Sequence, residues 1–117
     1  MDIPEIIVKL ADKYGAIVSR DVVNCPRNQG ASSGENIYLG EFDSPSIELV
    51  AFFHELGHVL SNSRVCKRGR VFTILSGEGL AWELGLGIAF EEGFLWPQNS
   101  SEMKYARAQF ATYSHDS

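Results

Sequence analysis

The sequence predicts a small α+β domain that takes up the whole chain, residues 1–117. Three observations support this prediction. Apolar residues recur at helical spacing in several segments, and short β-branched runs lie between the first two of them. The composition, 44% hydrophobic and 21% charged over 117 residues, is that of a globular protein with one core. We expect three or four helices, with one long helix packed against another, and a small, mainly antiparallel sheet.

The N-terminal third of the chain predicts one helix and two strands. The segment "PEIIVKLADKY" (4–14) places its apolar residues on one helical face, and Gly15 follows as a C-terminal stop. The β-branched run "AIVSRDVV" (16–23) is typical of a strand. The polar segment "NCPRNQGASSGEN" (24–36) indicates a loop, and "IYL" (37–39) a second short strand.

The remaining chain is mostly helical. A long helix begins with Ser44 as its cap and Pro45 in its first turn, and we expect it to end near Leu60, where "SNS" follows. The run 70–75 indicates a strand or an extended connection, and helices are expected over two further ranges, 77–92 and 101–113. Phe52, Phe53, Trp82 and Phe90 are expected in the core.

The long helix carries the sequence "HELGH", His54 to His58. Residues four apart lie on one face of a helix, so His54 and His58 can direct ring nitrogens at one metal ion. Glu55 projects about 100° further around the helix, outside that inner shell but within reach of a metal-held water. Zinc lowers the pKa of such a water, and a carboxylate can take its proton. The pattern therefore predicts a zinc-dependent hydrolase.

The alternative, two histidines that are merely packed in a helix, is disfavoured. The chain has three histidines, and two of them bracket a glutamate at metal spacing. Apolar neighbours on both sides predict burial, which is costly for imidazoles and carboxylates that lack a partner. The third histidine, His115, does not fit the pattern His-Glu-x-x-His-x-x-Gly-x-x-His. We therefore expect a carboxylate as third ligand: Glu78, at the start of the second long helix, with Glu83 as the alternative.

The run "HELGHVL" (54–60) followed by Glu78-x-x-Ala81-Trp82 resembles the compact gluzincins, which are thermolysin-like zinc peptidases. Among these it is most similar to the small bacterial and phage-encoded ImmA/IrrE-type domains, over roughly residues 36–90. The resemblance implies a zincin-like fold, His54, His58 and Glu78 as zinc ligands, and Glu55 as general base. It also implies a peptidase that in some relatives cleaves a repressor or another regulatory protein. The Phe-Ala and Leu-Leu-Met-Pro pattern common after the alanine is absent here.

A peptidase site also needs an edge strand for the substrate and a donor for the oxyanion. Residues 37–39 are expected to supply the strand. Tyr105, Tyr113 and His115 are the candidate donors near the C-terminus. Gly57, between the catalytic glutamate and the second histidine, is expected to let the second long helix approach closely.

A second function from another class stays open: a catalytically silent, zinc-stabilised interaction or regulatory module of bacterial or phage origin. The net charge of −5 argues against a nucleic-acid partner. The sequence shows neither a signal peptide nor an apolar run of membrane-spanning length, so we expect a cytoplasmic protein, or one in the host cytoplasm if phage-encoded. The expected partner is a protein or peptide substrate. Cys25 and Cys66 are expected to be free thiols.

Overall fold

The structure is a computed structural model that describes residues 3–68 and 76–114, with side chains over 3–61 and 81–109. Over these described residues it confirms an α+β domain, with four helices and a small sheet. The elements are, in chain order, α1 (Glu5–Tyr14), β1 (Ile17–Arg20), β2 (Gly30–Ser33), β3 (Asn36–Leu39), α2 (Pro45–Arg68), α3 (Ser76–Glu91) and α4 (Ser101–Ser114). The run 70–75, expected as a strand or connection, lies outside the described residues.

Helix ends follow the capping residues in the sequence. Helix α1 stops at Gly15, whose φ of 75° is the left-handed conformation that glycine adopts without a steric penalty. The hydroxyl of Ser44 accepts a hydrogen bond from the Ile47 N–H at 3.5 Å at the start of α2. At α4, Ser100 accepts one from the Met103 N–H at 3.1 Å. These bonds satisfy amide groups that have no partner within the helix.

Helix α2 is longer than the sequence predicted. It continues through "SNS" to Arg68, whereas an end near Leu60 was expected. Serine disfavours helix interiors because its hydroxyl can bond the backbone in other conformations. Here the Ser61 hydroxyl donates to the carbonyl of His58, 3.1 Å away within the same helix. The hydroxyl is thus satisfied inside the helix, and the helix continues past it.

The sheet is mixed and has the order β1-β3-β2, so the expectation of a mainly antiparallel sheet is wrong. β1 pairs with β3 in parallel, and β2 pairs with β3 antiparallel, with Gly30 opposite Leu39. Residues 37–39, expected as an edge strand, form most of the central strand, where Ile37 and Leu39 are buried. The edge strand beside the long helix is instead β2, which lies within the segment predicted as a loop.

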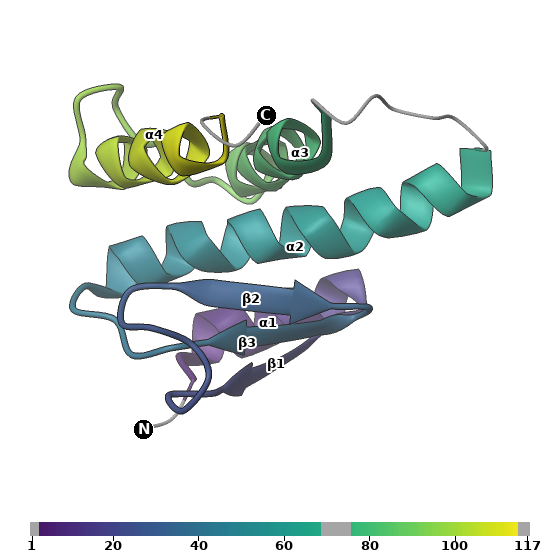
Figure 1. The fold of residues 1–117 in the computed structure, drawn as a ribbon, viewed down its shortest axis with the longest axis horizontal. Helices are drawn as coiled ribbons and strands as arrows, with labels where there is room; N and C mark the ends of the chain where they lie inside the picture. Colours follow the sequence, from purple (N-terminus) through teal and green to yellow (C-terminus); the bar gives the residue numbers. More distant parts are fainter. Residues whose placement is uncertain (1–2, 69–75, 115–117) are drawn as a thin grey trace.

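Helix α2 crosses the middle of the molecule, with the sheet and α1 on one side and α3 and α4 on the other (Figure 1). Its apolar side chains therefore face two layers, and Phe52, Phe53 and Leu56 are fully buried. Trp82 is buried as expected, but Phe90 is 65% exposed, so its expected place in the core is wrong. None of the helices in the described ranges has the length and apolarity needed to cross a membrane.

Candidate metal centre

The first and second histidines of "HELGH" lie together on α2. The ring centroids of His54 and His58 are 4.7 Å apart, as expected for residues one helical turn apart. His54 is buried and His58 is partly exposed. Two neighbouring imidazoles, one of them reachable from solvent, are a donor set that suits zinc and similar divalent metals. The residues that the structure describes here therefore fit two of the ligands expected for such an ion.

Glu55 turns from the same helix toward the edge strand β2. Its Oε2 lies 3.3 Å from Nδ1 of His54, and its side chain also hydrogen bonds with Ser32. Gly30 is close as well, because a Cβ at that position would lie 3.3 Å from Cγ of Glu55. The two positions of β2 that face Glu55 are thus a glycine and a serine, and these small residues leave room for the carboxylate.

The electrostatics of Glu55 favour its charged form. Burial raises the pKa of this carboxyl, but the hydrogen bonds to His54 and Ser32 and the nearby imidazole of His58 outweigh burial, and the net pKa is lowered. Glu55 is only 6% exposed. A buried carboxylate held in its ionised form between two hydrogen-bonding side chains can accept a proton.

Two glycines bring α3 against α2 beside the histidines. A Cβ at Gly57 would overlap the carbonyl oxygen of Ala81 and lie 2.8 Å from its carbonyl carbon. A Cβ at Gly85 would overlap the carbonyl oxygen of Phe53 and lie 2.8 Å from its carbonyl carbon. Both distances are shorter than real Cβ contacts, so the backbones touch where side chains are missing. This confirms the close approach expected at Gly57.

The close approach places Trp82 of α3 directly on His54. The indole and imidazole rings stack with centroids 4.0 Å apart and planes inclined by 4°. Both side chains are buried, each 5% exposed. Sequence reasoning placed Trp82 in the core but did not foresee this contact, because the spacing within α3 says nothing about its register on α2.

The third expected ligand lies in the first turn of α3. The backbone of Glu78 is helical there, and its side chain is outside the described part of the structure. The alternative, Glu83, is exposed to solvent. Among the side chains described, no three His, Cys, Asp or Glu residues form a metal-binding group. The identity of the third ligand therefore stays a prediction.

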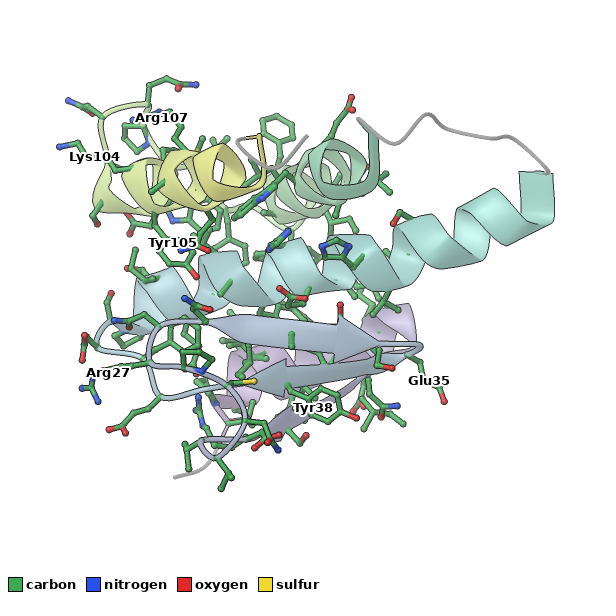
Figure 2. The ribbon with its side chains drawn as sticks, in the orientation of Figure 1. Arg27, Glu35, Tyr38, Lys104, Tyr105 and Arg107 are labelled. Carbon is green, nitrogen blue, oxygen red and sulfur yellow. The ribbon has the colours of Figure 1, made fainter. Side chains whose placement is uncertain are left out.

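The candidate oxyanion donors lie near the C-terminus. Tyr105 lies on the side of α4 that faces α2 (Figure 2), and its hydroxyl donates to the carbonyl of Asn28 at 2.8 Å. This bond ties α4 to the loop that precedes β2. The side chains of Tyr113 and His115 are outside the described residues.

Sequence reasoning missed the residues of β2 that surround Glu55. Gly30 and Ser32 belong to a run of small polar residues whose composition is typical of a loop. Every second residue of β2 is partly buried, but the sequence Gly-Ala-Ser-Ser does not alternate between apolar and polar residues, so it carries no signal of the strand.

The expectation that both cysteines are free is confirmed for Cys25, which is a buried free thiol; the side chain of Cys66 is outside the described residues.

Comparison with known proteins found no match: no protein-family model, no curated protein and no solved structure is significantly similar to this chain.

Proposed function

We propose that this domain is a zinc-dependent peptidase of the gluzincin type, with Glu55 as its general base. The observation that carries the proposal is the arrangement on one helix of three groups: two imidazoles 4.7 Å apart and a buried carboxylate beside them. A structural zinc site has no need of such a base and usually closes with a fourth protein ligand.

In this proposal His54, His58 and Glu78 would hold the ion. Zinc bound there would supply Lewis acidity, which lowers the pKa of water and polarises a carbonyl. Glu55 accepts the proton from the attacking water and delivers it to the leaving amine. Its lowered pKa keeps it ionised and ready to accept that proton at neutral pH.

The edge strand supports a peptide substrate over a small molecule. β2 lies at the edge of the sheet, and two of its residues, Gly30 and Ser32, border Glu55. An extended peptide can add to such an edge through main-chain hydrogen bonds. A peptide aligned on β2 would run past the carboxylate of Glu55, which places a main-chain carbonyl near the proposed base.

The test compares the zinc-loaded protein with two isosteric variants, Glu55→Gln and Glu91→Gln. Each is incubated with a diverse peptide library, and the products are identified by mass spectrometry. We expect cleavage by the unchanged protein, a loss of at least about 100-fold in Glu55→Gln because the general base is gone, and full zinc binding in both variants. Glu91→Gln should cleave normally, since Glu91 is exposed at the end of α3 and is not among the proposed ligands.

Two results would count against the proposal. Unchanged cleavage by Glu55→Gln would show that this carboxylate is not the base. No cleavage by any of the three proteins, with zinc bound in all of them, would favour the alternative function, a zinc-stabilised interaction module.

A further inference from the structure

The contact between Trp82 and His54 links the two long helices at the proposed metal site. The rings are nearly parallel, 4° apart, with centroids separated by 4.0 Å. Gly57 and Gly85 bring the helix backbones into contact close to this stack. The position of the indole is therefore set by the helix crossing, since α3 cannot move away from α2 without losing that contact.

The orientation of an imidazole decides where it can bind a metal. The nitrogen lone pair lies in the plane of the ring, so the ion must lie in that plane too. Contacts with Glu55 and Trp82 restrain the ring of His54. The Glu55 carboxylate meets its edge, 3.3 Å from Nδ1, and the indole of Trp82 covers one of its faces. The edge contact leaves the ring free to tilt, and the face contact removes that freedom.

On the side of α4, Trp82 packs in a small apolar cluster with Ala106, and Tyr105 packs against the same cluster. Beside this cluster Trp82 and Leu86 of α3, with Met103, Ala106 and Arg107 of α4, line an open pocket of about 220 Å³. The indole therefore has two kinds of contact, the apolar cluster and the stack on His54, and the experiment has to separate the effects of the two.

We propose that Trp82 is a positioning residue that holds the imidazole of His54 in the orientation needed for metal binding. The inference rests on the proposed metal site. Loss of a residue that orients a metal ligand typically weakens metal affinity by about 10–100-fold. Loss of the flat ring at Trp82 should therefore raise the zinc dissociation constant by at least about tenfold.

The experiment uses four variants of the full chain. Trp82→Leu removes the flat ring and keeps apolar bulk, and Trp82→Met does the same with a side chain that adapts to irregular space. Trp82→Phe keeps a flat ring. Trp96→Leu is the matched control, because Trp96 contacts the rings of Phe53 and Phe94 and packs against the apolar cluster of Trp82, whereas the ring stacked on His54 is that of Trp82. Far-UV circular dichroism selects the folded variants.

Two quantities are measured on each variant: the zinc dissociation constant by chelator competition, and the NMR shifts of the His54 ring protons in the metal-free protein. An indole stacked on the imidazole shifts these protons upfield. We expect Trp82→Leu or Trp82→Met to lose the upfield shift and about tenfold or more in zinc affinity. Trp82→Phe should recover most of both, and Trp96→Leu should keep both.

Unchanged zinc affinity in a folded Trp82→Leu or Trp82→Met variant that has lost the upfield shift would overturn the inference and leave the metal site standing. An equal loss of affinity in Trp96→Leu would also overturn it, since the effect would then be one of general stability. If the unchanged protein binds no zinc, the proposed function and the inference both fail.

Discussion

Substituting alanine at two glycines of α3 should change stability in opposite directions. Gly85 and Gly87 lie two residues apart in one helix, and both gain the intrinsic helix preference of alanine, about 1 kcal/mol. A Cβ at Gly87 meets nothing within 4 Å. A Cβ at Gly85 would overlap the carbonyl oxygen of Phe53 and lie 2.8 Å from its carbon, against an ordinary shortest contact of 3.4 Å.

The magnitude follows from which group must move. The Phe53 carbonyl belongs to the backbone of α2, so Gly85→Ala must shift a whole helix rather than a flexible side chain. Overpacking costs about 1–3 kcal/mol, and we expect a cost of about 3 kcal/mol here because backbone atoms have to move. Subtracting the helix preference leaves a net loss of about 2 kcal/mol for Gly85→Ala, whereas Gly87→Ala should gain up to about 1 kcal/mol.

Thermal and urea unfolding of the two variants measure these changes. For a domain of this size, 1 kcal/mol corresponds to about 4 °C in Tm, so we expect Gly85→Ala to melt about 8 °C lower and Gly87→Ala up to about 4 °C higher. A Gly85→Ala protein at least as stable as the unchanged chain would refute the close approach of α3 to α2. A marked loss in Gly87→Ala would refute the open environment of that residue.

Three further predictions concern other contacts. The hydrogen bond to Glu92, and secondarily burial, raise the pKa of Tyr14 to about 12, so the stability from this raised pKa is present below pH 10 and lost as the pH rises toward 12. Tyr14→Phe should therefore flatten the loss of stability between pH 10 and 12, measured by urea unfolding at each pH. Glu48→Leu should cost about 3 kcal/mol or more in urea unfolding, because it leaves the largely buried charge of Arg20 without its carboxylate. Gly57→Leu should lower zinc content, and normal zinc stoichiometry in this variant would contradict the link between close approach and metal binding.

The helices could be predicted because their signals are local. Helix α1 shows helical spacing and a terminal glycine within its own residues, and Ser44 and Ser100 cap the helices that follow them. The prediction failed at the end of α2, since Ser61 is satisfied by a bond to His58 that the serine's own preference does not reveal.

The sheet was harder to predict because its pairing is not local. β2 has the composition of a loop and exists as a strand because it pairs with β3 and faces α2. β1 pairs directly with β3 in parallel, although β2 lies between them in the sequence, and no feature of residues 17–20 indicates this pairing.

The same distinction between local and non-local signals applies to the candidate site. The spacing of His54, Glu55 and His58 follows from the helix alone, so the sequence predicted their proximity. The contacts of Ser32 and Trp82 depend on how β2 and α3 dock on α2, and these could be seen only in three dimensions.

The most direct test of the account is the zinc content of the purified protein after exhaustive dialysis, measured by mass spectrometry beside His58→Ala, Glu78→Gln and Glu83→Gln. The account predicts stoichiometric zinc in the unchanged protein and in Glu83→Gln, and a clear loss in His58→Ala and Glu78→Gln. Loss of zinc in Glu83→Gln but not in Glu78→Gln would show that Glu83, rather than Glu78, is the third ligand. Stoichiometric zinc in His58→Ala, or none in the unchanged protein, would contradict the central claim that the "HELGH" helix holds the metal.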